Sequence, residues 1–519
     1  ADAAEEQDTV ALVHDVAAGK ITHTVCDSDL FAHVQAFEPD AVALLPLKEG
    51  RVIALGLRPK NPKLKAAADA FLMQRALHAH ALEASLGDLD AIKRRGSLRM
   101  LTRNNAISYF LFKGQQQGFD YNLMKLFAAD HGLRLDVVVP PEASDLIPWL
   151  LEGKGDVIAA QLTATEERKQ AVRFSKPYLF ADEVLVQKAG AVPVASLSDL
   201  KGKTTHVRKS SSYRTTLDAL QKDHGPFIIV DAPEGTETEE LIAMVGRGDI
   251  PATVVDSNIA AVELAYRSDV QVALALKTGA EIGWATRPTS PQLGRALDAF
   301  VDKRYRGLEY NVLKKQYFEN RRVIASGHEG DVRITGTVSE YDPLLKERAR
   351  QYGLDWRLLA AQAYQESRFD PKAKSWVGAQ GLFQVMPATG REMGFTDLED
   401  PQQSVHAGAQ YMAKLIDSFD SRIPFKQRVR FALAAYNAGR GHVEDARLLA
   451  AEQGLDPNRW FGNVERTMLL LQQPKYARRA RHCYCRGEEP VHYVSEIQSR
   501  YDNWLSVVKD TGVDAAQAP

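Results

Sequence analysis

The chain has 519 residues, too many for one hydrophobic core, so we expect about three domains. Its composition is that of an ordinary globular protein, with 45% hydrophobic and 25% charged residues. The formal net charge of −2 lacks the basic excess that is typical of nucleic-acid-binding proteins, so no nucleic-acid partner is predicted. No run of about 18 apolar residues occurs, and no segment is expected to span a membrane.

Cysteine is scarce, which excludes a disulfide scaffold: the chain has only Cys26, Cys483 and Cys485. The two late cysteines lie in the segment His482-Cys483-Tyr484-Cys485, which lacks a second ligand pair at a recognisable spacing. We therefore predict no metal site and no cofactor. Because the sequence begins without Met or a signal peptide, we expect a mature or trimmed form.

The beginning of the chain repeats a later segment. Residues 9–72 align without a gap with residues 238–301, and the pair Asp27-Ser28 matches Asp256-Ser257. Identities recur along the whole alignment, so we interpret it as a duplication and not as two unrelated αβ segments. The first copy lacks the opening half of the unit that contains the second copy. We therefore predict a partial repeat over residues 1–75.

A helical connector is expected over residues 76–94, and an αβ unit follows it over residues 95–325. The unit opens with a strand-like segment at Leu98-Arg99-Met100-Leu101. An amphipathic helix from Phe119 to His131 and a strand from Leu135 to Val139 come next. Strands that alternate with helical patterns imply parallel sheets.

Three motifs inside this αβ unit occur in a characteristic order. They are Asp156-Val157-Ile158-Ala159-Ala160-Gln161-Leu162-Thr163 leading into Thr165-Glu166-Glu167-Arg168, then Phe174-Ser175-Lys176-Pro177-Tyr178, then the strand end Val254-x-Asp256-Ser257. This order resembles the amino-acid-binding family of periplasmic solute-binding proteins. The resemblance implies a two-lobed αβ module of the type II periplasmic-binding-protein fold.

A free amino acid or a peptide terminus carries a carboxylate and an ammonium close together. An Arg fork can hold the carboxylate with two hydrogen bonds, and an Asp can pair with the ammonium. By position in the resemblance, Arg168 would hold the carboxylate and Asp256, from the other lobe, the ammonium. The same carry-over predicts further ligand-binding residues at Gln161, Thr163, Ser211 and Tyr109, the last as a stacking wall. Gln161 stands where many relatives carry Ser, so the ligand chemistry is left open.

From Tyr341 to about residue 508 the pattern is helical. Leu354 to Arg368 reads as one helix, with Trp356, Leu359 and Ala363 on an apolar stripe that Glu366 continues. A carboxyl group there faces the core near a helix C-terminus, and both burial and the helix dipole disfavour its charged form. A raised pKa of this kind is what a general acid needs at neutral pH. An ordinary exposed Glu is the alternative that the spacing by itself leaves open.

Four motifs in this helical region point to one enzyme family. They are Glu366-Ser367-Arg368-Phe369-Asp370-Pro371 with Ser375, Gly378-Ala379-Gln380-Gly381-Leu382-Phe383-Gln384 with Met386-Pro387, Ala435-Tyr436-Asn437-Ala438-Gly439, and Glu489-Pro490-Val491-His492-Tyr493-Val494. This set resembles the soluble lytic transglycosylases with a lysozyme-like fold. Phe383 stands where the family usually has Met, and Pro490-Val491 where it has Thr-Arg.

The expected architecture is thus multidomain, an α/β module followed by a mostly helical domain. A linker over residues 326–338 would separate the αβ module from a lysozyme-like domain over residues 339–508, and residues 509–519 would form a disordered tail. The two modules in this order resemble the membrane-bound lytic transglycosylase F family. The N-terminal partial repeat departs from that plan.

The resemblance implies cleavage of the bond between N-acetylmuramic acid and N-acetylglucosamine in peptidoglycan glycan strands. Glu366 would act as the single acid/base and close a 1,6-anhydro ring on the muramic acid. Ser375, Gln384, Tyr436 and Glu489 would position the substrate and stabilise charge. An envelope location, periplasmic or at the outer membrane, follows from that substrate. The alternatives are a receptor that senses a solute or peptide, a wall-binding scaffold with an inactive lysozyme-like domain, and a hydrolytic lysozyme.

Overall fold

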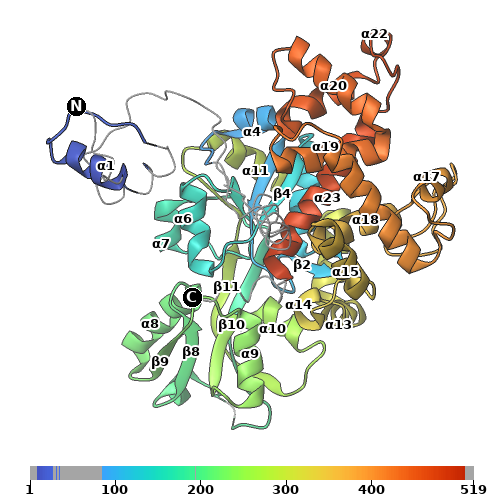
Figure 1. The fold of residues 1–519 in the computed structure, drawn as a ribbon. Helices are drawn as coiled ribbons and strands as arrows, with labels where there is room; N and C mark the ends of the chain where they lie inside the picture. Colours follow the sequence, from blue (N-terminus) through green and yellow to red (C-terminus); the bar gives the residue numbers. More distant parts are fainter. Residues whose placement is uncertain (1–8, 27–30, 32–33, 35–83, 193, 509–519) are drawn as a thin grey trace. The chain divides into compact units, whose positions relative to one another are not determined.

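The computed structural model describes residues 9–26, 31, 34, 84–192 and 194–508 (Figure 1). The chain divides into two compact units, Ala1–Lys65 and Ala66–Pro519. Within the described residues, no helix combines the length and the apolar character needed to cross a membrane.

The first unit contains helix α1 (Thr9–Ala17), whose Val13 packs with Val34 in a small buried cluster. In the repeat alignment α1 corresponds to helix α9 (Thr238–Arg247) of the second copy. The two copies therefore share this helix. Asp27, most of the predicted partial repeat, residues 76–83 of the predicted connector and the tail from residue 509 lie outside the described residues.

The second unit begins with the first lobe of the αβ module, called lobe 1 here. Its sheet has the order β4-β1-β5-β12-β6. The strands are β1 (Ser97–Leu101), β4 (Arg134–Val138), β5 (Val157–Ile158), β6 (Arg173–Phe174) and β12 (Ala285–Thr286). The helices of lobe 1 are α4 (Leu89–Arg95), α5 (Phe119–Asp130), α6 (Leu146–Leu151), α7 (Glu166–Ala171) and α11 (Pro291–Arg304). The predicted strands and helix at its start are confirmed, and β1 pairs in parallel with β4 and β5.

The second lobe, lobe 2, has a sheet of order β11-β7-β10-β8-β9. Its strands are β7 (Leu179–Lys188), β8 (Thr204–Arg208), β9 (Ile228–Ala232), β10 (Ala252–Asp256) and β11 (Val270–Ile282). Helix α8 (Ser212–His224) packs on Leu185 and Val254, whereas α9 and α10 (Ser257–Glu263) pack with Val184 and Val255. Because side chains alternate along a strand, these helices cover opposite faces of the sheet, as Figure 1 shows.

A short hairpin projects from lobe 1, formed by β2 (Phe110–Phe112) and β3 (Gln115–Gln117). The chain after lobe 2 passes through α12 (Leu308–Lys314) and a π-helical turn, η3 (Lys315–Glu319). It then forms α13 (Arg321–Glu329) and α14 (Val332–Thr335). The N–H of Lys113 in the hairpin donates to the carbonyl of Gly330 at 3.2 Å.

The segment predicted as a linker, residues 326–338, is largely helical, and its role as a linker stays a prediction. Ile324 and Val332 are buried and belong to the main hydrophobic core. These buried apolar residues hold the segment against the αβ module.

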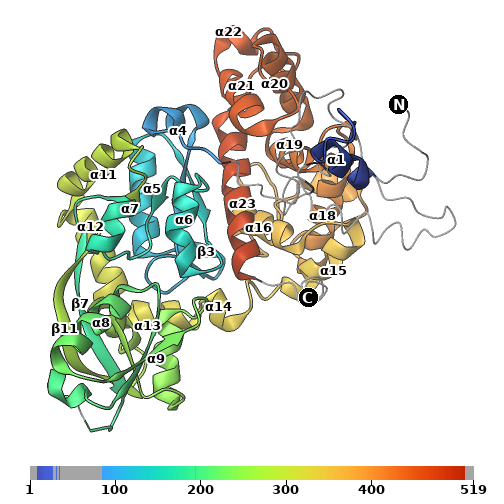
Figure 2. The ribbon, with the colours of Figure 1, turned by 90° about the vertical axis from the view of Figure 1, so that its left-hand side faces the viewer.

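The rest of the unit is helical, as predicted. The helices are α15 (Asp342–Tyr352), α16 (Trp356–Ser367), α17 (Pro387–Glu392), α18 (Pro401–Asp417), α19 (Phe425–Ala438), α20 (Arg440–Glu452), η4 (Trp460–Val464), α21 (Glu465–Leu470), α22 (Pro474–Ala477) and α23 (Glu488–Val507). Figure 2 shows α23 running alongside α16 and α19, both of which it contacts. Helix α16 is buried from Trp356 to Ala363, and its last turn is half-buried.

The helical domain and the αβ module touch at the tip of the hairpin. Gly114 has φ +76°, and a side chain there would come within 3.1 to 3.3 Å of Trp504, Tyr364 and Phe369. Nearby, the Arg134 guanidinium of β4 lies 4.2 Å from the centre of the Phe461 ring. The hairpin thus rests on residues that immediately flank Glu366.

Candidate functional site

Glu366 lies in the last turn of α16, where the apolar stripe predicts it. Trp356, Leu359 and Ala363 on that stripe are buried. The cap of the helix is Arg368, a non-glycine residue in the left-handed region with φ 54°, and Phe369 follows with φ 66°. Such conformations persist only when the surrounding structure holds them, and they are concentrated at functional sites.

Burial raises the pKa of Glu366 to about 7, and the hydrogen bond from Tyr493 opposes that rise. The Tyr493 hydroxyl donates to Oε1 of Glu366 at 2.5 Å. No basic side chain forms an ion pair with Glu366 among the described residues. The carboxyl group can therefore be neutral near pH 7 and still keep one fixed hydrogen bond that sets its orientation.

A loop after α16 carries two predicted substrate residues. Ser375 Oγ accepts from the N–H of Ala379 at 3.0 Å. The Gln384 amide donates to the carbonyls of Ala373 and Gly381 at 2.8 and 2.9 Å. These bonds close the loop on itself, so the structure gives both side chains a supporting role in the loop.

The same loop is tied directly to the Glu366 helix. The Ser367 hydroxyl donates to the Leu382 carbonyl at 3.0 Å, and the Tyr436 hydroxyl donates to the Phe383 carbonyl at 2.8 Å. Burial raises the pKa of Tyr436 well above its ordinary value, and the nearby Glu366 charge adds to the effect. Tyr436 thus lies within electrostatic range of Glu366, and its role in positioning the substrate stays a prediction.

Phe383, unusual for this motif, points into the core and is fully buried. A Cβ at Gly408 on α18 would lie 2.2 Å from the Phe383 ring. The glycine thus provides the space that the larger ring needs. The substitution changes the packing behind the loop and does not form an apolar wall of the site.

Among the described residues, Glu489 forms no hydrogen bond with Glu366, and its role in positioning the substrate stays a prediction. Glu489 lies in the first turn of α23, is exposed, and pairs with Arg486 at 3.3 Å. Tyr493, one turn further along the same helix, contacts Glu366 instead. Tyr493 is part of the same late motif, so the sequence did contain a signal for it.

In the αβ module, the Arg168 side chain crosses from lobe 1 to lobe 2. It donates to the Thr163 carbonyl at 3.0 Å and to the Ser210 carbonyl, in lobe 2, at 2.8 Å. Burial lowers the pKa of Arg168, which nearby Asp256 partly offsets. Among the described residues, no carboxylate lies in ion-pair contact with this guanidinium. The site therefore offers a partly desolvated cation with neutral partners.

Asp256 ends β10 beside Glu183 of β7, its direct partner in the antiparallel register. Both side chains are buried, and Oδ1 of Asp256 and both carboxylate oxygens of Glu183 lack hydrogen-bond partners. Lys277 lies 3.9 Å from Glu183. Burial, and then the charge of Glu183, raise the pKa of Asp256 to about 7. Sequence reasoning missed Glu183, although an acidic residue inside an apolar strand was a usable signal.

Gln161 joins the two lobes through a buried polar network. Its φ is 53°, its amide donates to Oδ2 of Asp120 at 2.9 Å, and its carbonyl accepts from Asn258 at 3.0 Å. The Thr163 hydroxyl accepts from Ser212 of lobe 2 at 3.4 Å. Gln161 and Thr163 therefore lie at the lobe boundary, where a ligand-binding role requires them.

Two other predicted ligand residues are placed differently. The Ser211 hydroxyl donates to the Arg208 carbonyl at 2.7 Å within the turn before α8, so it caps the turn. The Tyr109 ring is fully buried and packs edge-on against Tyr121 at 5.6 Å. A role as a stacking wall would require the ring to leave this packing, and it stays a prediction.

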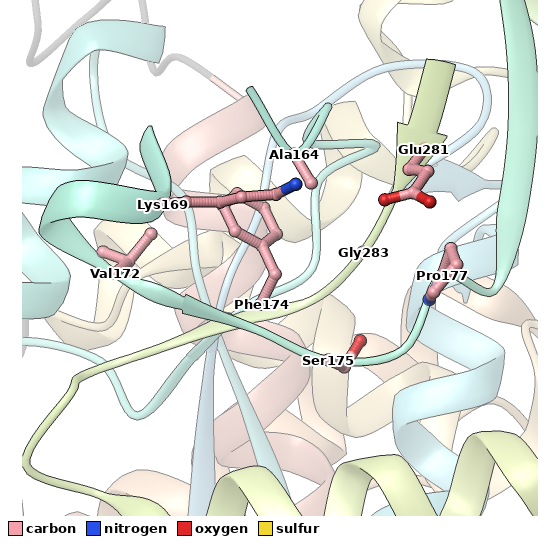
Figure 3. Close-up of a pocket in the computed structure, with 8 residues that line it drawn as sticks. All are labelled: Ala164, Lys169, Val172, Phe174, Ser175, Pro177, Glu281 and Gly283. Carbon is pink, nitrogen blue, oxygen red and sulfur yellow. The ribbon is translucent and has the colours of Figure 1, made fainter. Parts of the chain in front are cut away.

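A separate pocket of about 250 Å³ lies beside α7 (Figure 3). Lys169 and Glu281 extend toward it from opposite walls, and Ser175 and Pro177 close its lower edge. Lys169 is paired with Glu166 at 2.8 Å. None of the predicted ligand residues lines this pocket, so it is distinct from the site that those residues form.

Comparison with known families supports both modules. The sequence matches "Bacterial extracellular solute-binding proteins, family 3" over residues 98–320 and "Transglycosylase SLT domain" over residues 343–456. The membrane-bound lytic murein transglycosylase F of Desulfosudis oleivorans is 36% identical over 80% of this chain and 92% of that protein. The protein of the same name from Pseudomonas fluorescens Pf-5 is 34% identical over 89% of this chain and 95% of that protein.

The chain belongs to the membrane-bound lytic murein transglycosylase F family. The fold agrees with this membership, since a two-lobed binding-protein module precedes a lysozyme-like domain. Among solved structures, an ancestral arginine-binding protein bound to arginine is 28% identical over 43% of this chain and 99% of that chain, with a TM-score of 0.39. Within this member of the family, the residues around Glu366 and those between the lobes form two separate candidate sites.

Proposed function

We propose that this protein is a peptidoglycan lytic transglycosylase in which Glu366 is the acid/base. The observation that carries the assignment is a carboxyl group with a pKa near 7 in the last turn of a buried helix, held by Tyr493. Family membership supports the reaction class. Because the substrate is the cell wall, the protein works in the periplasm or at the outer membrane of the envelope.

The chemistry needs only one carboxyl group. Glu366 donates its proton to the glycosidic oxygen between N-acetylmuramic acid and N-acetylglucosamine, and the bond from that oxygen to C1 of the muramic acid breaks. The resulting carboxylate then takes the proton from the C6 hydroxyl of the same sugar. The C6 oxygen bonds to C1 and closes a 1,6-anhydro ring. No water molecule is activated in this reaction. It therefore does not need the second carboxylate that ordinary glycosidases use.

Product analysis tests this assignment. Purified peptidoglycan treated with the protein should yield anhydro-muramyl products by mass spectrometry. Reducing-end products would instead indicate a hydrolase. An absence of products, with or without added wall peptide, would favour the wall-binding scaffold.

The pH profile should report the Glu366 carboxyl group. The acid step requires the protonated form, so activity should fall by roughly tenfold per pH unit above a midpoint near the pKa of about 7. Tyr493→Phe removes the hydrogen bond that lowers the pKa, and the alkaline limb should move to higher pH. Initial rates on sacculi between pH 5 and 9 measure both profiles. An unchanged limb in the variant would show that Tyr493 does not tune this group.

We further propose that the αβ module binds a zwitterion, either an amino acid or a cell-wall peptide. Arg168 provides a desolvated cation without a carboxylate partner, and Asp256 with Glu183 provides carboxylate oxygens without donors. Buried charges are costly unless each has a partner, and of these three residues only Glu183 has an ion-pair partner among the described residues, Lys277 at 3.9 Å. A ligand with a carboxylate and an ammonium pairs with both the cation and the carboxylates.

Arg168→Ala should weaken such a ligand by roughly a hundredfold, because truncating one partner of a buried charge pair costs several kcal/mol. Calorimetry with purified peptidoglycan stem peptide and, separately, with single amino acids measures the loss and identifies the ligand class. Lys169→Ala is the matched control, since this neighbouring cation faces the separate pocket. Equal loss in both variants would contradict a specific role for Arg168.

Ligand binding and catalysis are proposed to be coupled through the hairpin. Helix α5, which carries Asp120 of the ligand network, follows directly from β3, and the hairpin tip at Gly114 rests on Tyr364 and Phe369. A shift of lobe 1 would therefore reach the residues on either side of Glu366. If activity on sacculi were unaffected by stem peptide and by Arg168→Ala, this coupling would be ruled out.

A further inference from the structure

The loop after Glu366 presents a tryptophan almost completely to solvent. Trp376 is 94% exposed, and the adjacent Val377 is 51% exposed. Large aromatic side chains are normally buried on average, and leaving an indole in water forgoes a considerable gain from burial. The five other tryptophans are buried or half-buried, so this position is the exception.

The loop that carries Trp376 is well ordered by hydrogen bonds. The N–H of Ser375 donates to the Ala379 carbonyl at 3.0 Å, and the N–H of Gly378 donates to the Ser375 carbonyl at 3.0 Å. Lys374 pairs with Glu399 at 2.5 Å at the base of the turn. Trp376 and Val377 therefore occupy the two central positions of a tight turn.

Local preferences do not explain this choice of residues. Central turn positions favour Pro, Gly, Asn, Asp and Ser, whereas Trp and β-branched Val are disfavoured there. A sequence that breaks a local rule without a gain in packing usually does so at a functional site. Since the indole packs against little in the protein, its gain must come from a molecule that binds.

The loop that carries Trp376 is anchored beside Glu366. The returning half of the loop is fixed to the Glu366 helix by Ser367 and to Tyr436 by its hydroxyl. Trp376 is six residues from Leu382, so its Cα lies within about 20 Å of that anchor. An extended glycan strand that places its scissile bond at Glu366 runs past neighbouring parts of the domain for several sugar units on either side.

We propose that Trp376 is a substrate-positioning residue that stacks on a pyranose ring of the glycan strand, away from the scissile bond. In a β-1,4-linked strand the ring substituents are equatorial, so each ring presents a face of axial C–H groups. Such a face is apolar and carries a slight positive charge, which matches the negative face of the indole. Any sugar ring of the strand can make this contact, which lengthens the region of the strand that the enzyme binds.

Kinetics on substrates of two lengths test this contact. Trp376→Ala should raise KM for long glycan strands about tenfold with kcat nearly unchanged, whereas a short oligosaccharide that does not reach the turn should be cleaved normally. Trp376→Phe should restore most of the affinity, because it keeps an aromatic face. Leu448→Ala, which removes a 65% exposed apolar side chain on α20, is the matched control. Equal effects on both substrate lengths, or none, would overturn the proposal.

A binding measurement separates this contact from catalysis. Titrating the inactive Glu366→Gln protein with long glycan strands should shift the tryptophan emission to the blue, and the additional Trp376→Phe change should abolish most of that shift. If Trp376→Ala instead weakened binding to phospholipid vesicles and left the strand KM unchanged, the residue would be a membrane contact and the proposal would be wrong. If wild-type protein yields anhydro products and Trp376→Ala leaves the KM for long strands unchanged, the assigned reaction still holds. Only the proposed contact of Trp376 is then wrong.

Discussion

Replacement of Glu366 by Gln is expected to lower the rate of glycan cleavage by about a thousandfold or more. General acid–base catalysis by one group contributes roughly 10²- to 10⁴-fold. In the proposed mechanism the same carboxyl group serves as acid and then as base, so one substitution removes both steps. Release of soluble muropeptides from sacculi at saturating substrate measures the loss.

A loss of folding would not explain that result. The pKa of Glu366 is raised to about 7 by burial, so the folded protein favours the protonated form. Its contribution to stability is fully present below the ordinary pKa of a glutamate and is lost as pH rises through about 7. A neutral amide avoids this penalty, and Glu366→Gln should unfold at an equal or higher temperature than wild type at pH 8. Glu452→Gln, a surface carboxylate paired with Arg479, should keep full activity. Comparable activity of Glu366→Gln and wild type would refute the assignment.

Asp156→Asn is expected to destabilise the αβ module by about 3–5 kcal/mol, the usual effect of removing one partner from a buried charge network. Asp156 is fully buried and accepts from the backbone N–H of Arg99 at 2.8 Å and from its guanidinium at 2.9 Å. Arg95 donates to the same carboxylate, and Arg287 lies 3.7 Å away. The amide would leave three guanidinium groups without their common counter-ion.

Chemical denaturation of the full chain, followed by circular dichroism, measures this change. Asp302→Asn is the control, because it breaks an ion pair with Lys176 in which both side chains are more than half exposed. Exposed pairs of that kind contribute only about 0–1 kcal/mol. If the two variants lost the same free energy of unfolding, the charge network around Asp156 would not stabilise lobe 1 more than an exposed ion pair does.

Hydrophobic periodicity was sufficient to predict the helices and strands around both candidate sites. The stripe of Trp356, Leu359 and Ala363 predicted the helix that carries Glu366 and the direction in which its carboxyl group points. The desolvation of that group followed from the same pattern, because residues three or four apart share a face of a helix. The division of the chain into domains stays a prediction, supported by the two family matches.

Such patterns could not predict the contacts between residues that lie far apart in the sequence. Glu489 and Tyr493 stand in one motif, but only the packing of α23 against α16 decides that the tyrosine meets Glu366. Glu183 becomes a ligand candidate only because the β7–β10 register places it opposite Asp256. Tyr109 is buried because its ring packs against Tyr121 in the core.

The sequence by itself determined the reaction family, the acid/base candidate and the two-lobed module, since these depend on motifs and periodicities within single segments. Only the tertiary structure decided which polar groups lack partners, that the hairpin at Gly114 touches the flanks of Glu366, and that Trp376 stays in solvent. The burial of a side chain and the pairing of its polar groups depend on contacts between segments far apart in the chain. A local sequence pattern does not predict these contacts.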